Sequence, residues 1–293
     1  GRNIYRNIET MVRLKDDDAA QQLLADLKRW RVNPRFLSQE PTGVTPLIVQ
    51  RSCTSDNGKA GHRFEWRDPA TGLALPRYRP LPQRVLQEVS GKLPKPNAFY
   101  FDRAVPSALL LARQARKLGA VVFYEPSSPG DPDLFAQAVA VADIVKYASD
   151  RLTPGSFAGM KIRPRLEVQT LGGEGLRYAL KGSGLRVWRS LPAASVDDFK
   201  DACGAGDWCS AGMLHLLARR GRATFLEAGE LHIIRALRCG QRLAALNCRH
   251  EGARGSMYHE PRRTFDRIIA WAGRQTVAGG KVPSGKPMSS RRP

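Results

Sequence analysis

The sequence predicts an α/β fold built on a doubly wound, mainly parallel β-sheet in three αβα layers. The first observation is that apolar strand-like segments alternate with helix-like segments between residues 98 and 148. Strands joined through such helices run parallel, and helices then cover both faces of the sheet. The second observation is an apolar fraction of 42% over 293 residues, which is ample for the core of such a sheet.

The alternation comprises three expected strands and two expected helices. In chain order these are the strand 98–102, the helix 105–119, the strand 120–126, the helix 133–142 and the strand 143–148. Further strands are expected at 166–172, 176–180 and 185–192, and a long helix at 224–247.

The amino-terminal part has a different texture. Residues 19–30 carry Leu23, Leu24, Leu27 and Trp30 at helical spacing and predict an amphipathic helix. Short β-like pieces at 44–51 and 62–66, separated by turn residues, predict a small β insert. We therefore expect an α/β core formed by residues 1–40 and 81–278, a β lid formed by residues 41–80, and a disordered basic tail over residues 279–293.

The charge balance is strongly basic, with 47 Lys and Arg against 27 Asp and Glu, or +20. Such a charge attracts polyanions, but the arginines are scattered and follow no known nucleic-acid-binding pattern. Nucleic-acid contact through the basic surface and an ordinary solvated surface both stay open. No apolar run is long enough to cross a membrane and no leader is visible, so we expect a cytoplasmic protein without a membrane partner.

The cysteines indicate a reducing compartment. There are 5, an odd number, and no two are arranged as CxxC. This pattern favours free thiols over a disulfide framework or a zinc site. In the insert, Cys53, His62 and Asp68 are irregularly spaced, which favours an ordinary β lid over a metal centre.

The segment 201–212, DACGAGDWCSAG, combines small residues with two carboxylates and leads into an apolar helix-like run. Without bulky side chains, the backbone of Gly204, Ala205 and Gly206 can close around an anion at the start of that helix. Asp207 follows in the first helical turn, where its carboxylate can accept a proton from an attacking hydroxyl. The alternative is a plain helix start, in which the aspartates only cap and the glycines only turn.

The same segment resembles the carboxyl-terminal signature D-x-x-G-A-G-D of the ribokinase-like (PfkB) carbohydrate kinases. The matching residues are Asp201, Gly204, Ala205, Gly206 and Asp207. Upstream, VQTLGGEG resembles the family element that contacts ATP, matching at Thr170, Gly172 and Gly175. Downstream, residues 239–253 resemble the family's helix and turn beside the adenine, with Gln241 in place of the usual asparagine.

This resemblance implies a ribokinase-like fold and an ATP-dependent kinase that phosphorylates a hydroxyl of a sugar, nucleoside or related small molecule. Asp207 would be the base, and the amides from Gly204 to Asp207 would form an anion hole. The implied cofactors are ATP and Mg2+, with a monovalent cation bound near Asp201, which also stands among the substrate-binding residues. The lid would cover the substrate and could join two copies into a homodimer.

The sequence also departs from the family pattern. Asn7 is the candidate for the family's substrate-binding asparagine, but the usual first strand is missing. Ala148 and Arg151 stand where the family often has N-x-x-E, which leaves Mg2+ to the nucleotide, to water and to Glu125 or Asp150. These departures support an alternative, a catalytically degenerate kinase-like basic module that binds nucleic acid or a protein partner.

Overall fold

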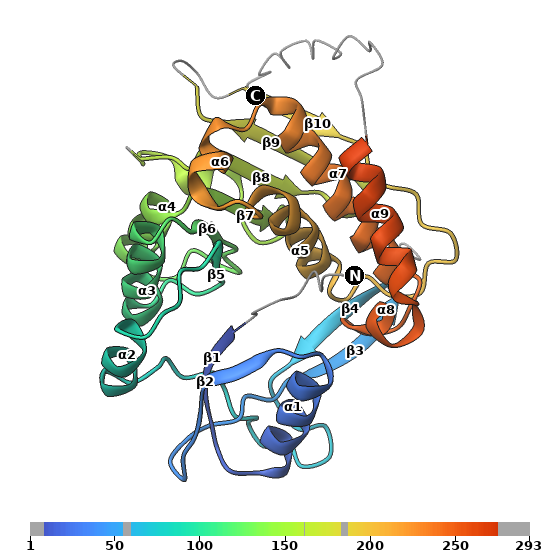
Figure 1. Cartoon of the computed structure of the whole chain (residues 1–293). Coiled ribbons are helices and arrows are strands. Elements are labelled where there is room, and N and C mark those ends of the chain that lie inside the picture. The colour runs from blue at the N-terminus through green and yellow to red at the C-terminus, as the bar shows by residue number, and fades with distance from the viewer. Residues whose placement is uncertain (1–8, 55–59, 161, 183–186, 275–293) are drawn as a thin grey trace, which may run out of the picture. The chain divides into compact units, whose positions relative to one another are not determined.

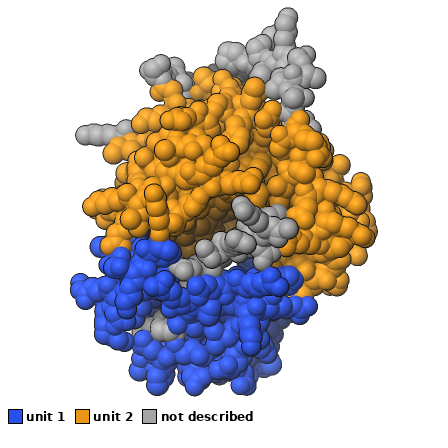
Figure 2. Space-filling view, viewed as in Figure 1, with its two compact units in different colours: residues 1–94, 105–111 blue, residues 95–104, 112–293 orange. Residues whose placement is uncertain are grey.

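The computed structural model describes residues 9–54, 60–160, 162–182 and 187–274. The chain divides into two compact units, coloured separately in Figure 2: unit 1 is residues 1–94 and 105–111, and unit 2 is residues 95–104 and 112–293. Residues 1–40 are thus grouped with residues 41–80, whereas we expected them with the α/β core. No helix in the described part of the chain is both long and apolar enough to span a bilayer.

Unit 1 begins with a β-α-β arrangement. Strand β1 (Glu9–Leu14) pairs in parallel with β2 (Asn33–Gln39), and helix α1 (Asp18–Arg29) connects them. The Asp17 carboxylate caps α1 by accepting a hydrogen bond of 2.9 Å from the Ala20 amide. The expected helix at 19–30 is confirmed, but β1 and β2 were not predicted. The two strands form a sheet of their own, separate from the six-stranded sheet of unit 2.

The insert contains the expected β structure. Strand β3 (Val49–Thr54) pairs antiparallel with β4 (Ala60–Glu65). Glu65 of β4 connects to β3 through an ion pair with Arg51 at 2.8 Å, and it also pairs with Arg63 of its own strand at 2.7 Å. These two bonds lower the pKa of the Glu65 carboxyl. The first strand begins at Val49 rather than at residue 44, because Pro46 cannot donate to a sheet ladder. Helix α2 (Gln83–Ser90) follows the insert.

Unit 2 contains a six-stranded sheet in the order β10-β9-β8-β7-β6-β5 (Figure 1). The parallel strands are β5 (Ala98–Phe101), β6 (Val121–Tyr124), β7 (Ile144–Ala148) and β8 (Leu166–Thr170). Two antiparallel strands, β9 (Leu176–Leu180) and β10 (Trp188–Leu191), complete one edge. Every expected strand of this region is present, so the mainly parallel α/β sheet is confirmed.

One face of the sheet is covered by helices α5 (Ala205–Leu217), α6 (Gly221–Glu227) and α7 (Glu230–Asn247) (Figure 1). Phe123, Ile144 and Val168 point into this core from three adjacent strands, opposite Met213 of α5 and Ile233 of α7. Helix α9 (Arg262–Arg274), which follows the short helix α8 (Gly255–His259), packs onto α7 and adds an outer apolar layer. We call this side of the sheet the α5 face.

The opposite face is covered by helix α4 (Pro132–Val141) and by aromatic packing. Phe135 of α4 lies 6.0 Å from Tyr124 and 5.4 Å from Phe157, measured between ring centroids, and Phe157 lies 4.9 Å from Tyr147. Phe157 comes from the short 3-10 helix η1 (Pro154–Phe157). Helix α3 (Pro106–Lys117) reaches this layer through Arg113, which donates to Gln137 of α4 at 2.7 Å. The sheet therefore has helices on both faces.

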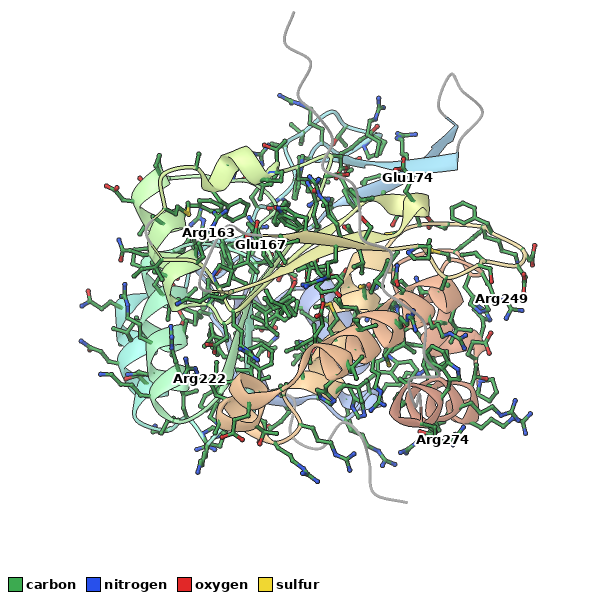
Figure 3. All side chains as sticks on the ribbon, turned by 90° about the horizontal axis from the view of Figure 1, so that it is seen from above. Arg163, Glu167, Glu174, Arg222, Arg249 and Arg274 are labelled. Carbon is green, nitrogen blue, oxygen red and sulfur yellow. The ribbon has the colours of Figure 1, made fainter. Side chains whose placement is uncertain are left out.

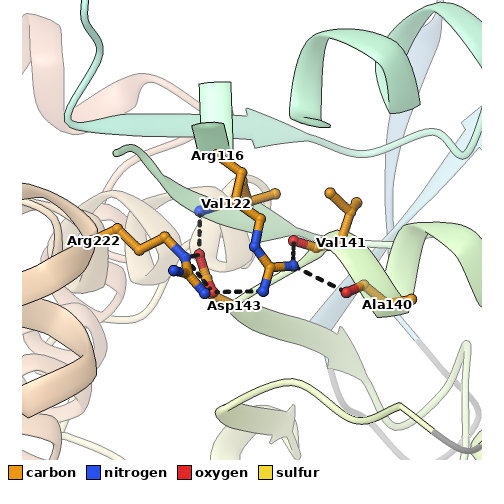
Figure 4. Close-up of polar contacts among 6 residues, drawn as sticks. All are labelled: Arg116, Val122, Ala140, Val141, Asp143 and Arg222. Carbon is orange, nitrogen blue, oxygen red and sulfur yellow. Dashed lines mark hydrogen bonds and ion pairs between the residues drawn. The ribbon is translucent and has the colours of Figure 1, made fainter. Parts of the chain in front are cut away.

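A buried carboxylate braces the amino-terminal end of β7 (Figure 4). Asp143 is 3% exposed and accepts two hydrogen bonds of 3.0 Å from the Arg222 guanidinium and one of 3.1 Å from the Val122 amide. Arg116 stands 3.9 Å away and donates to the Ala140 and Val141 carbonyls. These contacts join α3, α6 and two strands at the end of the sheet far from the candidate site described below.

One expected helix is divided in the structure, and one expected segment lies outside the described residues. The helix expected at 224–247 is wrong as a single helix, because the chain forms α6 and α7 with Ala228 and Gly229 in extended conformation between them. Glycine is costly inside a helix, which makes Gly229 a natural point for the break. The predicted tail at 279–293 lies outside the described residues.

Candidate active site

The turn before α5 depends on a close approach between two loops. Gly204 adopts φ 73°, a left-handed conformation, and a Cβ there would stand 2.5 Å from the Ala253 carbonyl oxygen. Only glycine avoids both the strain and the collision. On the other side of the turn, the Trp208 indole donates to the same Ala253 carbonyl at 3.0 Å and its ring stacks on Phe265. The turn is therefore held firmly against the segment that follows α7.

The first turn of α5 presents backbone N–H groups and a carboxylate together. Helix α5 begins at Ala205, and the Ala205 amide donates to the Ala202 carbonyl at 3.1 Å. That amide is therefore already used within the turn. The amides of Gly206 and Asp207 lie in the first helical turn, where helix geometry supplies no backbone acceptor. Together with the helix dipole they form a place for an anion next to the Asp207 carboxylate.

The carboxyl ends of the parallel strands face this turn with a row of polar side chains. Ala98, Phe123, Ile144 and Val168 pack into the core beneath α5. Side chains two positions further along a strand lie on the same face. The row therefore consists of Tyr100, Glu125, Lys146 and Thr170. Glu125 continues the pairing just beyond β6, since its amide donates to the Phe101 carbonyl at 3.0 Å.

Glu125 and Lys146 form a buried ion pair inside this row. The Lys146 ammonium donates to Oε1 of Glu125, and the lysine side chain is only 2% exposed. The other carboxylate oxygen accepts from the Ser210 hydroxyl on α5 and from the Tyr100 hydroxyl at 3.4 Å. Both oxygens of Glu125 are thus engaged by side chains of the protein.

Asp207 stands beside this pair and is exposed to solvent. Desolvation of its carboxyl by the surrounding chain raises its pKa, and the negative charge of Glu125 raises it further. Lys146 and Arg151 act in the opposite direction, and Asp102 adds to the increase. A carboxyl group with a raised pKa is a better proton acceptor than an ordinary aspartate.

Asp201 is buried and braces the loops around the turn. Its two carboxylate oxygens accept hydrogen bonds of 2.9 Å from the Cys203 and Gly252 amides, and the side chain is 6% exposed. Asn247 reinforces this connection by donating to the Cys203 carbonyl at 2.9 Å. The contacts that the structure gives Asp201 are therefore made within the protein. Its expected roles toward a substrate or a monovalent cation stay predictions.

The residues expected to contact the nucleotide lie at the far edge of the parallel strands. Thr170 ends β8, and the 3-10 helix η2 (Gly172–Glu174) follows it. Gly175 adopts φ 105°, and a Cβ there would stand 2.2 Å from the Leu191 carbonyl oxygen. Gln241 is 9% exposed and donates to the Pro192 carbonyl at 2.9 Å. Gly175 and Gln241 thus contact one segment, residues 191–193, from two sides.

The donor groups do not fit a magnesium ion held by the protein. Within the described residues no three His, Cys, Asp or Glu side chains gather in a way that could hold a metal. Of Glu125 and Asp150, the two alternatives that we expected for a protein ligand, Glu125 has both oxygens occupied by Lys146, Ser210 and Tyr100. A separate metal centre was considered in the insert, at Cys53, His62 and Asp68. Asp68 caps its own turn by accepting from the Ala70 amide at 2.8 Å, and the side chains of Cys53 and His62 lie outside the described residues.

The site also contains residues that sequence reasoning missed, and one that it cannot place. Lys146, Ser210 and Tyr100 belong to no sequence motif that we recognised. The alternation of side chains between the two faces of the sheet nevertheless places Tyr100 of β5 and Lys146 of β7 on the α5 face. Asn7 lies outside the described residues, so its substrate-binding role stays a prediction. Ala148 ends β7 and Arg151 lies in the following turn, its amide bonded to the Ala148 carbonyl at 3.1 Å.

Comparison with solved structures identifies the fold. Ribokinase from Giardia lamblia is similar with a TM-score of 0.68 and 15% identity, over 90% of this chain and 82% of that one. Fructokinase with bound ATP from Xylella fastidiosa gives a TM-score of 0.68 and 15% identity, over 92% and 87%. Aminoimidazole riboside kinase from Salmonella enterica, complexed with aminoimidazole riboside and an ATP analog, gives 0.65 and 19%, over 91% and 87%.

The sequence itself gives no such match. No protein-family model matches it, and no curated protein sequence matches it. The likeness is therefore one of architecture, and the ribokinase-like fold expected from the three motifs is confirmed.

Proposed function

We propose that this protein is an ATP-dependent kinase of the ribokinase (PfkB) type that phosphorylates a hydroxyl of a sugar, nucleoside or related small molecule. The observation that carries the proposal is the position of Asp207. It lies in the first turn of α5, behind the left-handed Gly204 and facing the carboxyl ends of the parallel strands. Ligands of open α/β sheets bind at this end of the strands. The similar solved structures, which include kinases with bound ATP or an ATP analog, support the same conclusion.

In the proposed reaction Asp207 accepts the proton of the substrate hydroxyl. The hydroxyl oxygen forms a bond to the γ-phosphorus of ATP while the bond from that phosphorus to the bridging oxygen breaks, and ADP leaves with the bridging oxygen. The amides of Gly206 and Asp207 and the α5 dipole would hold the phosphoryl oxygens. Gly204 serves by fixing the turn, and Ala205 by closing it through its bond to Ala202.

Nucleotide binding is assigned to Thr170, Gly172, Gly175 and the segment that Gln241 supports. Because the Gln241 amide is engaged with Pro192, we expect it to shape residues 191–193 rather than to contact adenine itself. Magnesium would come as a complex with ATP, bound by phosphate oxygens and water. Residues 41–80 would act as the lid that excludes water, and as the contact in a homodimer.

The test is Mg-ATP turnover over a panel of sugars and nucleosides, with Asp207→Asn as the main variant. Loss of a positioned base should lower kcat by about 10²- to 10⁴-fold. ATP binding, measured by calorimetry, should persist. Asp266→Asn is the matched control, because Asp266 lies on α9 in an exposed ion pair with Arg262. Equal turnover by the wild type and Asp207→Asn would contradict the assignment.

A second candidate function rests on the basic surface. Arg249 and Arg274 project outward at the edge of unit 2 (Figure 3), and Arg262, Arg263 and Arg267 of α9 are also exposed. A kinase-like module that binds nucleic acid would use such a surface, with affinity that falls steeply with salt. Salt-dependent retention of single-stranded RNA together with no saturable ATP binding would favour this function over the kinase.

A further inference from the structure

The buried Glu125–Lys146 pair lies directly against the turn that holds Asp207. A Cβ at Gly206 would stand 3.6 Å from Oε1 of Glu125 and 3.7 Å from Nζ of Lys146, so both charged atoms lie close to the start of α5. Ser210 lies four residues after Gly206, on the same side of α5, and its hydroxyl donates to Glu125. The first two turns of α5 are therefore fastened to β6 and β7 through this one carboxylate.

Burying such a pair is costly, because two charges leave water and an ion pair of this kind often contributes little net stability. Elsewhere in unit 2, the buried Asp143 and the half-buried Arg222 form an ion pair at the amino-terminal end of β7. The Glu125–Lys146 pair differs from it in position, since it lies at the carboxyl end of the strands under Asp207. Placement at this end indicates a role in the site itself.

We infer that Glu125 and Lys146 are positioning residues for Asp207, a pair that fixes the start of α5 and sets the local charge against which Asp207 takes up a proton. This inference rests on the proposed kinase function and adds two residues to it. Neither residue is expected to touch the substrate, because the lysine is buried and the carboxylate is held by Lys146, Ser210 and Tyr100.

Other groups also face Asp207 and have to be counted. Asp102 and Tyr100 come from the end of β5, and Arg151 follows β7. Desolvation raises the pKa of the Tyr100 hydroxyl, and Glu125 and Asp207 raise it further, so Tyr100 stays neutral over the range in which Asp207 titrates. Asp102 and Arg151 oppose each other in their effect on Asp207. Glu125 and Lys146 act on the pKa of Asp207 more strongly than Asp102 and Arg151 do, so substitutions in this pair should give the larger shifts.

The experiment measures the proton affinity of Asp207 in two ways. The first is the pH profile of kcat/KM, whose acid limb reports the base of the free enzyme. The second is the 13C chemical shift of the Asp207 carboxyl in protein labelled at aspartate Cγ, assigned by its loss in Asp207→Asn. The second measurement needs neither substrate nor turnover, so it tests the pair even if the kinase function fails.

Glu125→Gln removes a negative charge and should shift both readouts to lower pH by about one unit. Lys146→Met removes a positive charge and should shift both to higher pH by about one unit. The double variant should titrate close to the wild type, because the two changes cancel. Arg222→Leu is the matched control: it breaks an ion pair at the other end of β7, so it should lower stability and leave both readouts in place.

Opposite shifts in the two single variants, with no shift in Arg222→Leu, support the inference. It is overturned if both single variants titrate like the wild type, or if both shift in the same direction as Arg222→Leu, which would show general loosening of the fold. If Lys146→Met fails to fold, Glu125→Gln and Arg222→Leu still test the inference. A shift of Asp207 to lower pH in Glu125→Gln alone supports it, and any other result for Glu125→Gln overturns it. Absence of kinase activity in every protein, with opposite 13C shifts, would contradict the proposed reaction and leave the pair's effect on Asp207 established.

Discussion

Gly212 of α5 and Gly240 of α7 lie in direct backbone contact. A Cβ at Gly212 would stand 2.7 Å from the Cα of Gly240, and a Cβ at Gly240 would stand 2.4 Å from the Cys209 carbonyl oxygen. The two helices thus approach as closely as backbones allow. This contact fixes the depth at which α5 sits on the sheet, and with it the position of Asp207 one and a half turns earlier.

Alanine at either glycine should therefore destabilise unit 2. The atoms nearest to the added methyl group belong to the backbone of the facing helix and cannot easily move away, so we expect a loss of about 1–3 kcal/mol in the free energy of unfolding for Gly212→Ala or Gly240→Ala. The measurement is urea unfolding followed by circular dichroism. Gly273→Ala is the control, since a Cβ at Gly273 of α9 meets no atom within 4 Å. It should be neutral or stabilising by up to about 1 kcal/mol.

Asp207 should make stability depend on pH in a specific direction. A carboxyl group whose pKa is raised by folding binds its proton more tightly in the folded state. Its contribution to the free energy of unfolding is fully present below the pKa that the Asp207 carboxyl has in the unfolded chain. That contribution is lost as pH rises through the pKa of the same carboxyl in the folded protein. Asp207→Asn removes this loss, so the variant should become more stable relative to the wild type as pH rises through the acid range.

The size of this effect should stay below about 1 kcal/mol, because an exposed carboxylate is screened by solvent. Chemical unfolding of the wild type and Asp207→Asn at about pH 3 and about pH 7 measures it. A stability difference that is the same at both pH values would contradict the raised pKa.

The four cysteines whose side chains are described should be unreactive in the folded protein. Cys203, Cys209, Cys239 and Cys248 are all buried thiols outside any disulfide bond. Burial raises the pKa of the thiols of Cys209, Cys239 and Cys248 to about 11, so few thiolates exist near neutral pH. Native protein treated with iodoacetamide should carry no label at these positions by mass spectrometry, while denatured protein should be labelled at all four. Modification of native Cys209 at the rate of a free thiol would show that α5 opens readily.

The sheet of unit 2 was predictable because its first strands are mostly apolar. Residues 121–124 and 144–147 are buried on both faces of the sheet, and such runs alternating with helices allow few other arrangements. Strand β1 was missed for the opposite reason. Its six residues, ETMVRL, form neither an apolar run nor a strict alternation of polar and apolar types, and its partner β2 contains Pro34 and lies beyond a helix.

The candidate site was predictable only where it follows a local motif. The GAGD turn and Asp207 are contiguous in sequence, so they were found together. Lys146 lies in an apolar strand, and its partner Glu125 is 21 residues earlier, with Ser210 85 residues after Glu125. No local pattern links these three residues. They meet because β6 pairs with β7 and because α5 packs close to these two strands. Neither of these long-range contacts can be read from a local sequence pattern.

Gly204 allows a last test of the turn itself. Alanine there should cost about 1–2 kcal/mol for a left-handed backbone and about 1–3 kcal/mol more for the collision with Ala253. Gly130→Ala is the matched control, because Gly130 has φ 60° and its Cβ would meet no atom within 4 Å. Gly130→Ala should therefore lower the free energy of unfolding only by the cost of the left-handed backbone, with no collision added. The difference between the two free energies of unfolding measures the collision, and equal losses would mean that the loop at Ala253 yields freely. Because the collision moves the start of α5, Gly204→Ala should also weaken ATP binding in calorimetry, whereas Gly130→Ala should bind ATP like the wild type.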